Sequence, residues 1–189
     1  MRSHTIGKRL IAGLAGGALA ALSLALWLGA AQPSGAAAAR MPEFSRQTAA
    51  AWLNSPPLKS AELRGKVVLL EIFAAGWVNC QRSIPWVHGV HEKFGARGFA
   101  VIGIHTPEFE WEKDRAAVER MAGKFGLKNP IYLDTDSAYW EALGNNYWPA
   151  FYLVDQRGDI RLSSVGEMHT GEGDAPRFEE AIARLLAAG

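Results

Sequence analysis

The chain has 189 residues, of which 49% are hydrophobic and 21% charged. This length suits one domain with a sizeable core, and this composition is that of a globular protein rather than a disordered or fibrous one. Residues 40–189 hold 17 basic and 19 acidic side chains without a basic stripe, so nucleic acid is not an expected partner.

The first 39 residues have the features of a targeting segment. Three basic residues begin it, residues 10–31 carry no charge, and small residues at 35–39 end it. This order predicts a signal peptide cleaved after Ala39, although the uncharged run is also long enough to anchor the chain in a membrane. In either case we expect a periplasmic or secreted domain, free or held at the membrane through residues 10–31.

Residues 40–56 form a lead-in segment before a domain expected at 57–189, with Phe44 and Trp52 as its anchoring side chains. Beyond it, patterns typical of strands alternate with patterns typical of helices. The predicted strands are Val67–Phe73, Phe99–Ile104, Ile131–Leu133, Ala150–Asp155 and Asp159–Ser164. The predicted helices are Val78–Phe94, Trp111–Phe125, a short helix capped by Asp136 or Ser137, and a last helix capped by Asp174. This order predicts an α/β fold with a mixed sheet and helices on both sides.

Cys80 is the only cysteine of the chain, and it lies in the first turn of the helix that follows the buried strand Val67–Phe73. An exported protein meets conditions that permit disulfides, but one cysteine cannot form a disulfide within its own chain. The role of this thiol therefore depends on its surroundings.

Four motifs occur in an order that resembles a known family. They are LRGKVVLL at 63–70, NCQR at 79–82 followed by Pro85, GIHTPEF at 103–109, and YWPA at 147–150. Together they resemble the extracytoplasmic thioredoxin-like proteins of the TlpA/ResA type, and among these the thioredoxin domain of DipZ-like cytochrome biogenesis proteins. The resemblance covers about Trp52 to Gly173. It implies a thioredoxin-like three-layer α/β/α sandwich with a mixed central sheet.

The same resemblance assigns roles to single positions. The family's attacking cysteine falls on Trp77 and its resolving cysteine on Cys80; its buried acid falls on Glu71 and its cis-proline on Pro149. The first cysteine must be a thiolate at a helix N-terminus, and the second must then resolve a mixed disulfide. Because an indole cannot do the first task, the sequence WVNC in place of Cys-x-x-Cys excludes ordinary dithiol exchange.

Two functions remain open for such a degenerate active site. In the first, Cys80 with Glu71 carries out one-cysteine redox chemistry, with a protein or peptide thiol or disulfide of the cell envelope as its partner. In the second, a catalytically silent domain binds a peptide or envelope protein at Trp77, Trp148 and Pro149. Each of these residues also has a purely structural interpretation. Cys80 would be a small buried hydrophobic residue, Glu71 a structural buried acid, and Trp77 a side chain packed into the core.

Metal and cofactor sites are not expected. His88 and His91 lie three residues apart on one predicted helix, and His105 follows a predicted strand. Without a companion cysteine pair or a His-x-x-x-His pattern, we interpret these histidines as solvated or structural groups.

Overall fold

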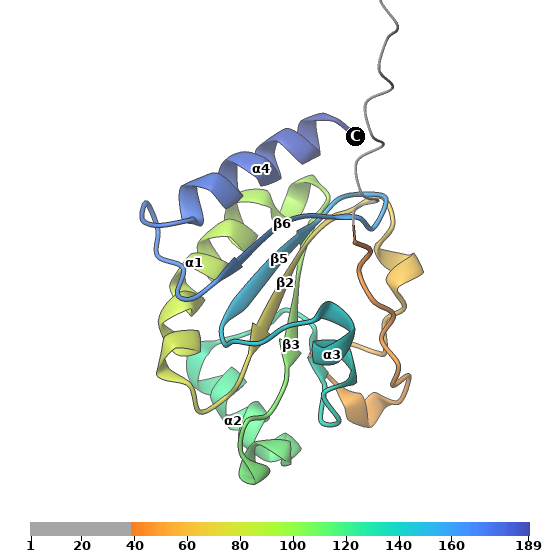
Figure 1. Cartoon of the computed structure of the whole chain (residues 1–189), viewed down its shortest axis with the longest axis vertical. Coiled ribbons are helices and arrows are strands. Elements are labelled where there is room, and N and C mark those ends of the chain that lie inside the picture. The colour runs from red at the N-terminus through yellow and green to blue at the C-terminus, as the bar shows by residue number, and fades with distance from the viewer. Residues whose placement is uncertain (1–38) are drawn as a thin grey trace, which may run out of the picture. The chain divides into compact units, whose positions relative to one another are not determined.

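The computed structural model describes residues 39–189 (Figure 1). The predicted signal or anchor segment falls almost entirely on residues 1–38, outside the described part of the chain. Between residues 39 and 189, no helix is both long enough and apolar enough to cross a membrane.

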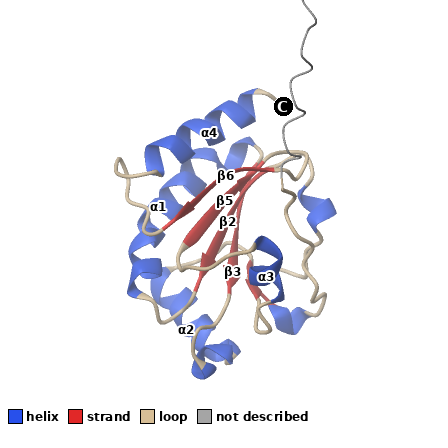
Figure 2. Ribbon diagram, in the orientation of Figure 1, coloured by secondary structure: helices blue, strands red, loops and turns tan. Residues whose placement is uncertain are grey.

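The centre of the fold is a six-stranded mixed sheet with strand order β1-β4-β3-β2-β5-β6 (Figure 2). Its strands are β1 (Trp52–Leu53), β2 (Val67–Phe73), β3 (Phe99–His105), β4 (Ile131–Leu133), β5 (Ala150–Val154) and β6 (Ile160–Val165). The neighbours β2, β3 and β4 run parallel, whereas β1, β5 and β6 each pair antiparallel. The predicted mixed sheet is therefore confirmed, with strand ends shifted by one residue in three cases.

Helices cover both faces of this sheet, as predicted. They are α1 (Val78–Phe94), α2 (Arg115–Phe125), α3 (Ala138–Leu143) and α4 (Ala175–Ala187), joined by the 3₁₀ turns η1 (Ala49–Ala51), η2 (Ser60–Leu63), η3 (Gly95–Arg97) and η4 (Glu110–Lys113). One face packs against α1, α2 and α4, and the other packs against α3 and the lead-in segment (Figure 1). Every residue of β2 is buried, as expected for a central strand covered on both faces.

The lead-in segment contributes to both the core and the sheet. Phe44 and Trp52 are buried with ring centroids 4.8 Å apart, which confirms them as anchors. Trp52 also pairs with Tyr132, so the segment adds the edge strand β1, which we did not predict. Two residues are too few to show the alternation that identifies a strand in a sequence.

The structure corrects one predicted helix start and one predicted cap. The predicted helix Trp111–Phe125 is divided into η4 and α2 at Asp114, whose backbone is extended and whose side chain accepts a hydrogen bond from the Ala116 N–H. An N-cap residue is non-helical, so Asp114 separates the two elements. In α4, Asp174 does occupy the N-cap position, but its carboxylate accepts from the Ser164 hydroxyl instead of capping the helix.

The first turn of α3 is held mainly by a residue that we did not single out. The two carboxylate oxygens of Asp134 accept hydrogen bonds from the N–H groups of Tyr139 and Trp140, at 2.9 and 3.0 Å. Ser137 occupies the N-cap position without a side-chain bond, and Asp136 accepts only from the Ala138 N–H at 3.3 Å. Asp134 replaces them because it directly follows β4, where its side chain reaches the first turn of the helix.

Candidate functional site

The candidate site lies where β2 ends and α1 begins, beside the ends of β3 and β4 (Figure 1). Parallel strands place their carboxyl ends at one edge of a sheet, so the loops that follow β2 and β3 meet there. Trp77 ends the first of these loops, and the segment from Thr106 to Lys113 forms the second.

Glu71 is a buried acid in the middle of β2. It is 3% exposed and pairs with Gly103 of β3 and Phe151 of β5. Burial in a low-dielectric surrounding raises the pKa of its carboxyl group to about 8, because the charged form loses its hydration. At neutral pH the carboxyl group is therefore predominantly protonated.

Cys80 lies in the first turn of α1 and is 3% exposed. Its side chain shares with Glu71 the wall of a cavity of about 10 Å³, which Phe73, Ile84 and Met121 help to enclose. Burial raises the pKa of the Cys80 thiol to about 12, with a smaller contribution in the same direction from the charge of Glu71. The thiol is thus held in its protonated, weakly nucleophilic form.

Trp77 occupies the N-cap position of α1, directly before the first helical residue. Its half-buried indole packs against the apolar cluster that contains Cys80, and its ring lies 5.9 Å from that of Trp148 in a stacked arrangement. The indole N–H donates a hydrogen bond to the carboxylate of Glu108. Both the inward-packing and the surface interpretations of Trp77 therefore apply in part.

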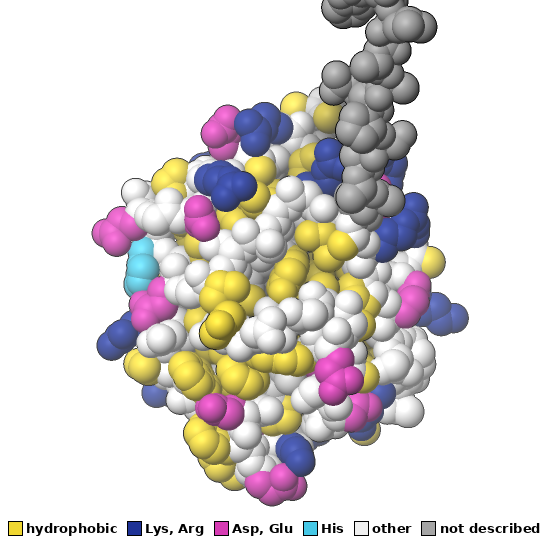
Figure 3. Space-filling view, in the orientation of Figure 1, with side chains coloured by type: hydrophobic (Ala, Val, Ile, Leu, Met, Phe, Trp, Pro, Cys, Tyr) yellow, Lys and Arg dark blue, Asp and Glu magenta, His cyan; other side chains and the backbone are white. Residues whose placement is uncertain are grey.

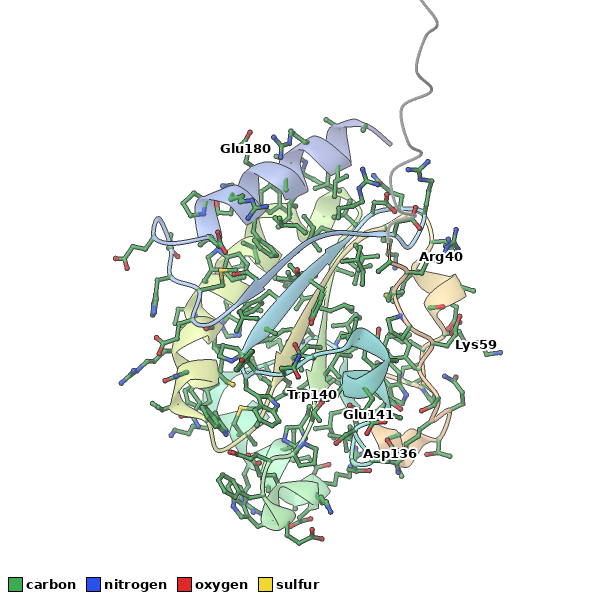
Figure 4. The ribbon with its side chains drawn as sticks, viewed as in Figure 1. Arg40, Lys59, Asp136, Trp140, Glu141 and Glu180 are labelled. Carbon is green, nitrogen blue, oxygen red and sulfur yellow. The ribbon has the colours of Figure 1, made fainter. Side chains whose placement is uncertain are left out.

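Trp148 is held by an aromatic contact and by a hydrogen bond. Its ring centroid lies 4.2 Å from that of Trp140, which α3 directs toward the ends of the central strands (Figure 4). Its indole N–H donates to the carbonyl of Thr106 at 3.0 Å. The peptide bond to Pro149 is cis, and the buried Pro149 accepts a hydrogen bond from the Gly166 N–H through its carbonyl oxygen.

A buried carboxylate ties the two loops of the site together. Glu112 is fully buried, and its Oε1 accepts a hydrogen bond from the Gly76 N–H at 2.6 Å. Its Oε2 accepts from the N–H groups of Glu108 and Phe109, at 2.8 and 3.0 Å. The carboxylate thus fixes both the residue before Trp77 and the residue whose side chain binds the Trp77 indole.

Exposed apolar side chains surround this arrangement. Val78, Phe109, Trp111 and Tyr147 are each between 49% and 62% exposed. Val78 and Tyr147 adjoin Trp77 and Trp148 in sequence, and the Trp111 ring packs so closely on Gly76 that a Cβ there would lie 2.8 Å from it. Figure 3 shows hydrophobic side chains gathered at the same end of the domain, where η4 lies. Large exposed apolar patches of this kind are typical of interaction surfaces.

The histidines do not form a metal centre with other residues of the described part. No group of three or more His, Cys, Asp or Glu side chains between residues 39 and 189 is arranged to hold a metal ion. His88 and His91 instead line a cavity of about 180 Å³ between α1 and the loop after α2. His105 is fully buried against Phe73, with both ring nitrogens unpaired, and burial lowers its pKa to about 4.

The fold therefore brings together all five residues selected from the sequence. Glu71 and Cys80 share one small cavity, Trp77 covers the same apolar cluster, and Trp148 with Pro149 lies beside Trp77. Glu108, Glu112 and Trp140 were not among the residues selected from the sequence. Glu108 lies within the GIHTPEF motif and Glu112 lies shortly after it. The motif therefore identified this segment, but not the residues that its side chains contact.

Comparison with known proteins identifies relatives for most of the chain. The family model described as Redoxin matches residues 36–182. The protein DipZ of Mycobacterium bovis is 42% identical over 138 residues, which cover 71% of this chain and 19% of DipZ. The chain thus spans about a fifth of the length of that relative.

Two further proteins match along nearly their whole length. The thiol-disulfide oxidoreductase YkuV of Bacillus subtilis is 27% identical over 147 residues, covering 78% of this chain and 94% of YkuV. A crystal structure of a thioredoxin-like superfamily protein has a TM-score of 0.68 at 27% identity, covering 79% of this chain and 97% of that one. The expected thioredoxin-like fold is confirmed.

Proposed function

Since this chain belongs to the Redoxin family of thioredoxin-like proteins, we propose that its domain is a binding module rather than a dithiol oxidoreductase. It holds an extended peptide or protein segment on the surface formed by Trp77, Trp148 and Pro149 with their exposed apolar neighbours, hereafter the tryptophan surface. The observation that carries this proposal is the Trp77 indole, which stacks on Trp148 and packs over the cluster that buries Cys80.

The chemistry of the site argues against exchange of disulfides. Thioredoxin-like exchange needs a thiolate that attacks a substrate disulfide and a second thiol that resolves the product. This chain has one thiol, Cys80, and a thiol with a pKa of about 12 is ionised to roughly one part in 10⁵ at neutral pH. Its burial also blocks the in-line approach of a disulfide.

The arrangement of the aromatic side chains argues for binding. Trp77 and Trp148 are both fixed by hydrogen bonds through their indole N–H groups, so their faces are ordered before a partner arrives. Rigid aromatic side chains lose little conformational entropy on binding, and for this reason they are frequent at interfaces. The exposed rings of Phe109, Trp111 and Tyr147 would add apolar area for the same partner.

The setting of this module is also part of the proposal. Residues 1–39 would export the chain, as a cleaved signal peptide or as an anchor through residues 10–31, and the thioredoxin-like domain expected at 57–189 would include the lead-in at 40–56, which supplies β1 and part of the core. The partner would then be a protein of the cell envelope.

The test uses reduced, carboxymethylated α-lactalbumin, an unfolded protein without free thiols, as the probe. We expect the protein to bind this probe and to leave insulin unreduced in the presence of either dithiothreitol or glutathione. Replacing Trp77→Ala should weaken binding by about tenfold, since a buried aromatic contact contributes on that scale. Cys80→Ser should bind like the wild type, and Leu186→Ala, on α4, serves as a matched control away from the surface.

Two results would overturn the proposal. Insulin reduction that disappears in Cys80→Ser would establish one-cysteine redox chemistry as the function instead. Equal binding by the Trp77→Ala and wild-type proteins would remove the tryptophan surface as the binding site.

A further inference from the structure

The strand β6 has an outer edge that the proposed function does not use. β5 pairs with one side of β6, and among the described residues the other side is bridged only at its start, where the Ile160 N–H donates to the Ala39 carbonyl. From Arg161 to Val165 the outer edge has no strand partner in the described part of the chain. A free edge of this kind can accept another extended chain.

A groove runs between this edge and the neighbouring helix α4. Two cavities of about 310 and 320 Å³ share Arg161, Leu162 and Arg177 in their walls, and Ala181, Arg184 and Leu185 complete the first. The four α4 residues recur at helical spacing, so they lie along one flank of the helix, facing Arg161 and Leu162 across the first cavity. Apolar side chains, among them Leu162, Ala181 and Leu185, thus line the groove together with arginines from both β6 and α4.

The groove is basic. Three arginines and no carboxylate line its two cavities. The nearest acids to Arg161 and Arg177 are Asp155 and Asp174, at 3.9 and 3.8 Å, which are distances too long for hydrogen bonds. In the described part of the chain, the guanidinium groups of Arg161 and Arg177 therefore have donors left for a ligand.

The third arginine also has an acidic neighbour, but this neighbour lies outside the groove. Arg184 donates a hydrogen bond to Glu180 at 2.9 Å. Figure 4 shows Glu180 on the outer side of α4, directed away from the sheet. Since both side chains are about two thirds exposed, the pair is weak and a better-placed carboxylate can compete for the guanidinium.

We propose that this groove docks an extended acidic segment of a protein partner, which adds to β6 as a further strand. Backbone hydrogen bonds to the free edge would supply part of the affinity, as in other cases of strand addition. Because side chains alternate along a strand, every second residue of the partner would face the α4 flank. Carboxylates at those alternate positions would meet Arg177 and Arg184 in bidentate geometry.

The arginine-lined end of this surface is separate from the tryptophan surface. The start of β6, where Arg161 lies, is the end of the strand opposite Val165, and Val165 is the residue that pairs with Ala150 next to Pro149. A partner docked at the arginine end of β6 could therefore be bound at the same time as a segment on the tryptophan surface, whereas a partner strand that reaches Val165 ends beside that surface.

The test measures binding of a labelled peptide of alternating glutamate and threonine to the full chain by fluorescence anisotropy. Two control peptides have glutamine in place of glutamate, or the same residues in two blocks. We expect the Arg177→Gln/Arg184→Gln variant to bind the alternating peptide about tenfold more weakly, and the wild type to bind either control peptide more weakly by a similar factor. Arg120→Gln, an exposed arginine on α2, should have no effect.

Hydrogen exchange of the backbone amides separates strand addition from simple charge attraction. Addition of a strand should slow exchange of the outward-facing amides of Ser163 and Val165 when the alternating peptide binds, whereas the amides of Leu162 and Ser164 face β5 already. Equal binding by the double variant, equal binding of the block peptide, or no slowing in β6 would each overturn the proposal. So would outward-facing amides of Ser163 and Val165 that already exchange as slowly as those of β5 before peptide is added, because the edge would then be occupied.

Discussion

Oε1 of Glu112 lies 2.6 Å from the backbone nitrogen of Gly76, so a buried carboxylate holds the residue before Trp77 from a position 36 residues later in the chain. The other oxygen of the same carboxylate accepts from the N–H of Glu108, the partner of the Trp77 indole. One side chain thus sets the relative positions of both members of the Trp77–Glu108 hydrogen bond.

The first prediction follows from the two carboxylate oxygens of Glu112, which together accept three backbone hydrogen bonds. The variant Glu112→Gln keeps one acceptor oxygen and directs an NH₂ group at backbone N–H groups, so at least one buried donor is left unpaired. We expect a loss of about 2–4 kcal/mol in the free energy of unfolding, measured in urea. We also expect faster hydrogen exchange of the Trp77 indole N–H, because its acceptor on Glu108 is no longer fixed.

The control for this variant is Glu119→Gln, which removes an exposed carboxylate paired with Arg115. Such surface pairs contribute about 0.5 kcal/mol or less. If Glu112→Gln were no less stable than Glu119→Gln, the carboxylate would not hold the two loops together.

The second prediction concerns access to the thiol. Cys80 should react slowly with Ellman's reagent in the folded protein, because its pKa of about 12 and its 3% exposure both suppress attack. Removing the indole in Trp77→Ala uncovers the apolar cluster that contains Cys80. This change should raise the rate at which Cys80 reacts with Ellman's reagent by at least about tenfold. Trp111→Ala, which removes an exposed indole nearby, should leave the rate unchanged; a similar rise in both variants would count against Trp77 as the cover.

The prediction of the fold succeeded where the signal was local. The apolar run of β2, interrupted only by Glu71, and the glycines that end α1 and α2 defined these elements, and the four family motifs indicated the thioredoxin-like fold. Glu71 and Cys80 could be placed together because the family resemblance assigns both to one site, around a single strand-to-helix turn.

The contacts of Trp77 with Glu108 and of Gly76 with Glu112 could not be found in this way. They join positions 31 and 36 residues apart, and they exist because β2 and β3 are parallel neighbours whose following loops meet at one edge. No local pattern records which side chains of two such loops will bind. The helix boundary at Asp114 was different, since an aspartate three residues after Trp111 is itself an N-cap signal that could have been used.

The third prediction is a pH dependence of stability that Glu71 causes. Its pKa is raised from 4.5 to about 8, so between these values the folded state keeps a proton that the unfolded state has lost. Stability should therefore be greatest below pH 4.5 as far as this group is concerned, and should fall as pH rises toward 8, by an amount on the order of a few kcal/mol. Glu71→Gln, which is neutral at every pH, should remove most of this decline in urea titrations; an unchanged decline would contradict the assignment.

The fourth prediction uses His105, whose shift has the opposite sign. Its pKa is lowered from 6.5 to about 4, so the unfolded state binds a proton in this range while the folded state does not. The stability contributed by the neutral ring is present above pH 6.5 and is lost as pH falls toward 4. His105→Phe should flatten that loss, whereas replacement of the exposed His91 by Gln should not; equal acid sensitivity of both variants would exclude His105 as its source.

The last prediction restores the missing sulfur. In Trp77→Cys, the new thiol stands at the N-cap of α1, where unpaired N–H groups and the helix dipole favour a thiolate. Because Cys80 lies three residues later on the same turn, a disulfide between the introduced thiol and Cys80 can form and be reduced in turn. We therefore expect insulin reduction with dithiothreitol to appear in Trp77→Cys, to be absent in the wild type, and to disappear again in Trp77→Cys/Cys80→Ser. A folded Trp77→Cys protein without this activity would mean that position 77 does not correspond to the attacking cysteine of the family.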